Sequence, residues 1–191
     1  MRKVEKMTFT AMMIALAFTI AEMMKLIPIL QHPQGGSVSL ALLPIFVLAF
    51  YLGPVYGTIG GIGYGIINFF FDGYGYNPWS IVFDYVLAFG LVGLIAGFCS
   101  KWAMRGYKWY NFISVIGGMT IACSVRFLMH TIAGTLAWNT PFGASALYNA
   151  GYVFGSLGFC LAIILLAYKP LTDYAVSKFV EKDITIEEIK K

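Results

Sequence analysis

Six apolar segments, separated by short polar or glycine-rich links, run along most of the chain. They lie at residues 7–30, 38–52, 54–71, 79–100, 111–138 and 147–170. A helix needs about 20 apolar residues to cross a membrane, and the first, fourth, fifth and sixth segments are long enough. The second and third segments are shorter and meet at Leu52 and Gly53, just before Pro54. Because proline suits the first turn of a helix, we expect two short or tilted helices here, joined by a tight turn.

The composition places the chain in a membrane. Hydrophobic residues make up 59% of the 191 residues and charged residues 12%, and the mean hydropathy is +0.77. A soluble domain has about 25% charged residues. We therefore predict an all-α membrane protein, a compact bundle of six transmembrane helices. The net charge of +4 is more typical of an orientation signal in such a protein than of nucleic-acid binding.

Lysine and arginine residues are distributed unevenly between the two ends of the predicted helices. They occur before the first segment, between the fourth and fifth, and after the sixth: Arg2, Lys3, Lys6, Lys101, Arg105, Lys108, Lys178, Lys182, Lys190 and Lys191. The links 31–37, 72–77 and 139–145 contain neither residue type. Since positively charged loops stay in the cytoplasm, we expect both termini to be cytoplasmic and these three links to face outward.

Small residues recur every four positions in three parts of the chain. The repeats are Ala11 and Ala15 in the first segment, Gly53, Gly57, Gly61 and Gly65 at and within the third, and Gly93 and Gly97 in the fourth. In lipid, such spacing lets two helix backbones approach closely. The repeats therefore predict either packing within the bundle or a docking surface for another membrane protein.

Few ionisable residues lie inside the predicted spans, where a charge is costly. Glu22 and Lys25 are three residues apart on the first helix, so we expect them to pair with each other. Asp84 lies in the fourth helix, and Arg126 and His130 lie in the fifth. By helical rise, Asp84 and His130 have a similar depth in the outer half of the predicted bundle.

Several further residues share this outer half. They are Tyr74, Tyr85, Gly134, Trp138 and Asn149. His130, Gly134 and Trp138 follow at four-residue spacing and therefore share one face of their helix. This face therefore presents an imidazole, a position without a side chain and an indole. Together with the buried carboxylate of Asp84, they predict an outward-facing pocket for a cationic aromatic ligand. The structural alternative is an ion pair between Asp84 and Arg126 that joins the two helices.

The sequence lacks the motifs of several other functions. It contains no GxxxxGK[ST] phosphate-binding loop and no HExxH or GxSxG motif, and its three cysteines lack metal-ligand spacing. We therefore predict neither an ATPase nor an intramembrane enzyme, and no metal or cofactor. A self-sufficient secondary transporter stays open as an alternative, although no inverted repeat is evident and polar residues do not continue to the cytoplasmic side.

Four stretches resemble a known family. HPQGGSVSLALLPIF (32–46), FDYVLAFG (83–90), RFLMHTIAGTLAW (126–138) and YNAGY (148–152) are similar to the thiamin-specific substrate-binding subunits, or S-components, of energy-coupling factor transporters. The resemblance implies a multi-pass protein of the bacterial cell membrane that binds thiamin at its outer face. It also implies docking onto a shared transmembrane subunit with two ATPases, which alone would use ATP. The substrate-binding domain would span 1–180, and 181–191 would be a polar cytoplasmic tail.

The same resemblance implies roles for individual residues. Asp84 would lie against the thiazolium ring, and His130 and Asn149 would hydrogen-bond the aminopyrimidine or the hydroxyethyl group. The other ligand-binding positions would be Tyr74, Tyr85, Gly134 and Trp138, beneath a lid formed by Gln34, Gly35, Gly36 and Ser37. Ala11 and Ala15 match the motif with which the family docks onto its partner.

Two positions depart from the family pattern. Some members carry glutamate where this chain has Asp84, and many carry tyrosine where it has Ala144. A shorter carboxylate and a missing ring could shift selectivity toward a related small vitamin or precursor, such as hydroxymethylpyrimidine or pyridoxine. These substrates therefore stay beside thiamin as alternatives.

Overall fold

The computed structural model of the protein describes residues 2–32, 35–72 and 77–180. These residues are almost entirely helical, and their only β contact is an isolated antiparallel bridge between Gln31 and Ser37. The expected polar tail, 181–191, lies outside the described residues.

The helices follow one another with short links. The α-helices are α1 (Lys3–Lys25), α2 (Leu42–Leu52), α3 (Pro54–Asp72), α4 (Pro78–Ser80), α5 (Ala88–Phe98), α6 (Trp109–Trp138), α7 (Phe142–Leu166) and α8 (Tyr168–Ala175). Two short 3-10 helices are η1 (Pro28–Leu30) and η3 (Cys99–Lys101), and two π-helical stretches are η2 (Ile81–Leu87) and η4 (Val176–Val180).

Each of the six expected segments contains helix. The third begins at Pro54 and the fifth ends at Trp138, as predicted. The first segment was expected to continue to residue 30, but α1 ends at Lys25. Pro28 explains the early end, because proline lacks the backbone donor and disfavours a helical residue before it. Among the described residues, four helical stretches are long and apolar enough to cross a membrane: α1, Pro78–Lys101, α6 and α7.

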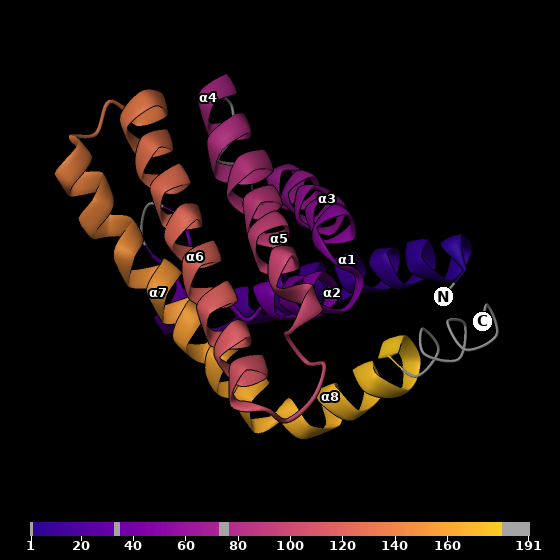
Figure 1. Ribbon diagram of the computed structural model, residues 1–191. Helices are drawn as coiled ribbons and strands as arrows, with labels where there is room; N and C mark the ends of the chain where they lie inside the picture. The colour runs from indigo at the N-terminus through magenta and orange to yellow at the C-terminus, as the bar shows by residue number, and fades with distance from the viewer. Residues whose placement is uncertain (1, 33–34, 73–76, 181–191) are drawn as a thin grey trace.

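Helices α5, α6 and α7 lie side by side, and α3 packs against α5 (Figure 1). Helices α1 and α2 cross this row at a steep angle (Figure 1). The short helix α2 forms the centre of the molecule, since nine of its 11 residues are buried and Phe46 and Phe50 are fully so. It is therefore covered by other helices of the protein on most of its surface.

Glycines of α3 and α5 bring the two helices into close contact. A Cβ atom added to Gly57 would lie 2.3 Å from the carbonyl oxygen of Gly93, and one added to Gly93 would lie 1.9 Å from that of Gly57. Gly61 and Gly97 face backbone atoms of the opposite helix in the same way. These repeats therefore serve packing within the bundle.

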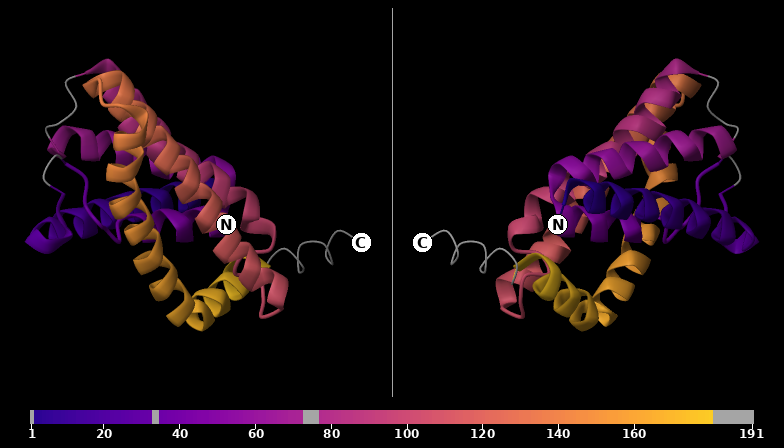
Figure 2. Two further views of the ribbon diagram at one scale, coloured as in Figure 1. Left: turned by 90° about the vertical axis from the view of Figure 1, so that its left-hand side faces the viewer. Right: turned by 90° about the vertical axis from the view of Figure 1, so that its right-hand side faces the viewer.

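Helix α8 turns sharply away from the end of α7 and lies at the bottom of the molecule in both views of Figure 2, level with the lower ends of α6 and α7. Two tyrosines connect it with the link between η3 and α6. Tyr168 donates to the carbonyl oxygen of Gly106 at 3.0 Å, and Tyr107 donates to the carboxylate of Asp173. The hydrogen bond to this carboxylate raises the pKa of Tyr107 to about 12.

The fourth segment is not a uniform α-helix. Its residues Ile81–Leu87 form the π-helix η2, and the backbone N–H of Ala88 donates to the carbonyl oxygen of Phe83, five residues earlier. A π-turn is wider than an α-turn and is frequently found at functional sites. In this chain η2 carries Asp84 and Tyr85, so the irregular turn sets the direction of both side chains.

Candidate ligand-binding cavity

A cavity of about 890 Å³ lies between α1, α3, η2, α6 and α7, with the segment after η1 along one wall. Its lining contains most of the residues that the sequence nominates for ligand binding. They are Asp84, Tyr85, His130, Gly134, Trp138 and Asn149, together with the lid residues Gly35, Gly36 and Ser37. Tyr74 and Gln34, nominated for the same site, lie outside the described residues.

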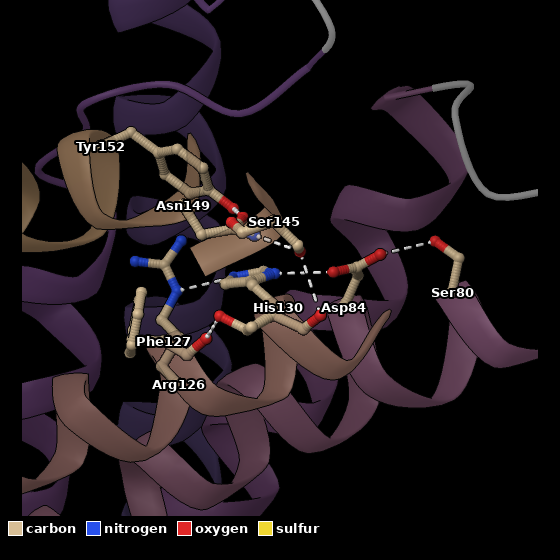
Figure 3. A network of polar contacts seen from close by, with 9 residues as sticks. Ser80, Asp84, Arg126, Phe127, His130, Ser145, Asn149 and Tyr152 are labelled. Carbon is tan, nitrogen blue, oxygen red and sulfur yellow. Dashed lines mark hydrogen bonds and ion pairs between the residues drawn. The ribbon is translucent and has the colours of Figure 1, made fainter. Parts of the chain in front are cut away.

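A chain of polar contacts connects residues that line the cavity (Figure 3). Ser80 donates from Oγ to Asp84 Oδ2 at 2.8 Å, and Asp84 Oδ1 lies 2.7 Å from His130 Nδ1. Arg126 donates from Nε to His130 Nε2 at 3.2 Å. Arg126 and His130 are each 7% exposed, whereas the Asp84 side chain is 22% exposed. The carboxylate is therefore the member of this chain that is most open to a ligand.

The sequence left open an ion pair between Asp84 and Arg126, but the structure connects these two residues through a third. Across the described ranges, Arg126 makes no direct salt bridge to Asp84; His130 lies between them (Figure 3). The Arg126 guanidinium instead lies 4.9 Å from the centre of the Phe89 ring. The electrostatic connection between α6 and η2 thus runs through an imidazole.

A second polar chain joins α6 to α7 beside the first (Figure 3). Ser145 donates to the carbonyl oxygen of Thr131 at 3.0 Å, and Asn149 donates to the carbonyl oxygen of Ser145 at 2.8 Å. Tyr152 donates to Oδ1 of Asn149. Asn149 is therefore held on both its nitrogen and its oxygen, and its amide orientation is fixed before any ligand arrives.

Gly134 and Trp138 differ in what they contribute to the cavity. A Cβ atom on Gly134 would lie 2.1 Å from Ser145 Oγ, so the space beside this glycine is occupied by the serine of α7. From the sequence, Gly134 was expected to leave this space open for a ligand. Trp138 lines the cavity with 56% of its surface exposed, which is the position of a rim residue. Ala144, where a ring was noted as missing, is exposed on the same rim.

The described part of the lid packs onto α7. His32 donates from its backbone N–H to Gly36 O at 3.0 Å, and the Tyr148 hydroxyl donates to Gly35 O at 2.7 Å. Gly36 has a φ of +83°, and a Cβ atom there would lie 2.9 Å from the Tyr152 ring. Both the backbone angle and the close approach require glycine at this position.

Comparisons with known proteins identify one family. The sequence profile of the family described as Thiamine transporter protein (Thia_YuaJ) matches residues 7–176. The chain belongs to this family. It is 29% identical over 150 residues to the thiamine transporter ThiT of Bacillus subtilis (strain 168), covering 73% of this chain and 78% of that protein. It is 30% identical over 165 residues to ThiT of Lacticaseibacillus paracasei (strain ATCC 334), covering 80% of this chain and 82% of that protein.

A solved structure shows the same fold. ThiT from Listeria monocytogenes superposes with a TM-score of 0.73 at 23% sequence identity, over 89% of this chain and 98% of that one. As a member of the thiamine transporter family with several apolar spanning helices, the protein is a multi-pass bacterial membrane protein. The family consists of transporters and not of enzymes.

Several residues that line the cavity were not predicted from the sequence. Tyr148 and Tyr152 both line it, as does His32, whose ring packs edge-on against both tyrosines with centroids 5.5 Å apart. The two tyrosines could have been anticipated, because Tyr148 and Tyr152 are four residues apart on one helix face and lie on either side of Asn149 in the sequence. Lys25 also lines the cavity and forms the expected pair with Glu22, at 2.6 Å.

Proposed function

We propose that the protein is the thiamin-binding S-component of an energy-coupling factor transporter. The observation that carries this proposal is the carboxylate of Asp84 in an aromatic-lined cavity of a thiamine transporter family member. Its two hydrogen-bond donors, Ser80 and His130, hold the carboxylate in place and leave it partly exposed. Thiamin carries a permanent positive charge on its thiazolium ring, and such a ring is stabilised by a carboxylate and by aromatic faces.

The size and lining of the cavity support a ligand of this kind. Binding cavities for small molecules usually measure about 300–1,000 Å³ and combine apolar walls with a few polar groups. The value here, about 890 Å³, leaves room for both thiamin rings. Tyr85, Phe89 and Trp138 offer aromatic surface. Both ring nitrogens of His130 are already engaged by Arg126 and Asp84, so His130 offers the ligand its ring face, and Asn149 offers the second lone pair of Oδ1. The amino group of the aminopyrimidine or the hydroxyl of the hydroxyethyl group can donate to that oxygen.

The proposed topology has six transmembrane helices with both termini in the cytoplasm. It rests on the distribution of Lys and Arg, and it makes residues 1–180 the substrate-binding domain and 181–191 a cytoplasmic tail. In this orientation the cavity opens outward, and the segment 34–37 acts as its lid. Tyr74, in the outward link before α4, completes the proposed binding set.

Energy for uptake would come from partner subunits. The sequence has no phosphate-binding loop of its own, so a shared transmembrane subunit with two ATPases would supply it. Ala11 and Ala15 support docking, because both are exposed on α1 in the isolated protein and their small side chains allow a second helix to approach closely.

A fluorescence titration tests the binding proposal. The purified protein in detergent is titrated with thiamin, and then with hydroxymethylpyrimidine, pyridoxine and riboflavin. We expect saturable quenching of tryptophan emission by thiamin and weaker responses to the others, because Trp138 stands on the cavity rim and only thiamin has the thiazolium charge. Trp138→Phe is the matched control, since it keeps a ring at the site and should remove most of the signal change.

Each outcome has a clear meaning. A stronger response to hydroxymethylpyrimidine or pyridoxine would keep the cavity and reassign its substrate, with Ala144 as the first position to change. No response to any compound, confirmed by calorimetry, would overturn the thiamin proposal. Thiamin counterflow into liposomes that contain this protein alone would replace the S-component proposal with that of a solitary secondary transporter.

A further inference from the structure

His130 is hydrogen-bonded through both ring nitrogens, and the two partners differ in chemistry. Arg126 donates from Nε to His130 Nε2 at 3.2 Å, while His130 Nδ1 lies 2.7 Å from Asp84 Oδ1 (Figure 3). A guanidinium has only donors and no acceptor. His130 Nε2 must therefore offer a lone pair, and the proton of the neutral ring lies on Nδ1, from which it is donated to the carboxylate.

We propose that Arg126 is a positioning residue that keeps His130 neutral and protonated on Nδ1, and thereby keeps Asp84 an ionised acceptor for a cationic ligand. This inference rests on the proposed function for the identity of that ligand. Its first part, the protonation state of His130, concerns the ligand-free protein and is independent of thiamin.

The surroundings of Arg126 hold it in this role. Its guanidinium lies 4.9 Å from the centre of the Phe89 ring, a cation–π contact that restrains the head group, and the residue is 7% exposed. The arginine is one helical turn before His130 on α6, so the donor cannot move away without unwinding the helix or changing rotamer. Arginine stays charged at every relevant pH.

The other ionisable groups around His130 do not replace Arg126. Asp84 approaches from η2, and Tyr152 approaches from α7 with its ring centre 5.7 Å from that of His130. Further ionisable residues line the same cavity: Lys25, His32, Tyr64, Tyr85 and Tyr148. Lys25 is paired with Glu22 on α1. Arg126 is therefore the permanent cation bonded to the imidazole.

Protonation of His130 would have two consequences. An imidazolium has a donor on each nitrogen, so the hydrogen bond from Arg126 would be lost and two cations would stand side by side. The imidazolium would also neutralise Asp84 and compete with the thiazolium for the carboxylate. By opposing protonation, Arg126 makes the affinity for a cationic ligand insensitive to pH across the range in which a histidine ordinarily titrates.

The tautomer is measured directly by nitrogen NMR on ligand-free protein labelled with ¹⁵N-histidine. The chain contains two histidines, so His32→Gln assigns the resonances of His130. We expect a protonated Nδ1 and an unprotonated Nε2 at about pH 8 and at about pH 6, the range of ordinary histidine titration. A proton on Nε2 at either pH value would overturn the proposal.

Two variants separate the charge of Arg126 from its shape. Arg126→Met removes the donor and the charge while keeping an apolar stem, and we expect His130 to gain a proton on Nε2 as the pH falls from about 8 to about 6. Arg126→Lys restores a cationic donor and should retain the wild-type spectrum. If the spectrum of Arg126→Met equals that of the wild type at both pH values, Arg126 does not control His130.

Thiamin titrations over the same pH range test the consequence for binding. A competing proton weakens affinity by up to about tenfold for each pH unit below its titration midpoint. We expect Arg126→Met to lose about tenfold in affinity between about pH 8 and about pH 6, and the wild type and Arg126→Lys to change less than about threefold. Parallel pH profiles of wild type and Arg126→Met would overturn the inference, whereas absent thiamin binding with the expected NMR tautomer would overturn only the proposed function.

Discussion

At the scale of single residues, the cavity depends on the charge of Asp84. Ser80 and His130 each occupy one carboxylate oxygen, and the side chain keeps 22% of its surface exposed. An unligated carboxylate in a membrane protein is costly, and here the cost is reduced by these two donors and by Arg126 behind His130. The remaining lone pairs of Asp84 are available to a ligand cation.

Asp84→Asn should weaken thiamin binding while leaving the fold intact. Two unit charges about 4 Å apart attract by about 4 kcal/mol near a protein surface, and solvent screens part of this at the partly exposed Asp84. The affinity should therefore fall by roughly 10- to 100-fold, as measured by calorimetry. Asp84→Glu keeps the charge and should lose much less. The neutral hydroxymethylpyrimidine should bind the wild type and Asp84→Asn alike. Equal thiamin affinity of the two proteins would exclude charge pairing at Asp84.

At the scale of elements, helix contacts depend on where side chains are missing. Helices α3 and α5 approach until their backbones touch at Gly57 and Gly93. Gly117 in α6 has no such role, since a Cβ atom there would meet nothing within 4 Å. The glycines in this chain are therefore not equivalent, although the sequence offers little to distinguish them.

Gly93→Ala should separate α3 from α5. Its new methyl group would meet the Gly57 carbonyl at 1.9 Å, and a backbone atom cannot move aside as a flexible side chain does. Overpacking of this kind costs about 1–3 kcal/mol and should lower the thermal unfolding midpoint in detergent by several degrees. Gly117→Ala is the matched control and should be neutral or slightly stabilising, because alanine is the better helix former. Equal midpoints would mean that the α3–α5 contact is looser than its geometry indicates.

At the scale of the whole molecule, the cavity and the proposed docking surface lie on different parts of the protein. Ala21 and Lys25, near the end of α1, line the cavity, while Ala11 and Ala15 lie earlier on the same helix and are exposed. Ligand capture and coupling to a partner can therefore be altered separately.

Ala11→Trp combined with Ala15→Trp should preserve thiamin binding and abolish thiamin uptake. Two indoles on α1 would prevent a partner helix from approaching closely, but they lie outside the cavity lining. Binding is measured on the purified protein, and uptake is measured with labelled thiamin in cells that contain the energising subunits. Ile121→Trp, at a 58% exposed position of α6, is the control and should retain both. Normal uptake by the double variant would place the partner elsewhere.

The sequence by itself determined the class of the protein, the approximate helices and several of the residues that line the cavity. A membrane requires apolar segments of a certain length with few charges, so these segments can be recognised in the sequence. The depth of a residue along a helix follows from the constant rise per residue. For this reason Asp84 and His130 could be placed together without coordinates, and both line one cavity. The assignment of ligand roles to them stays a prediction.

Only the tertiary structure decided how these side chains are oriented. The π-helix at Ile81–Leu87 has no residue signature, because one extra residue in a turn is accommodated by packing. The serine that occupies the space at Gly134, and the imidazole between Arg126 and Asp84, depend on how α7 and η2 are rotated against α6. Rotation between helices is set by side chains far apart in the chain, so a local pattern determines which residues share a face and not which of them meet.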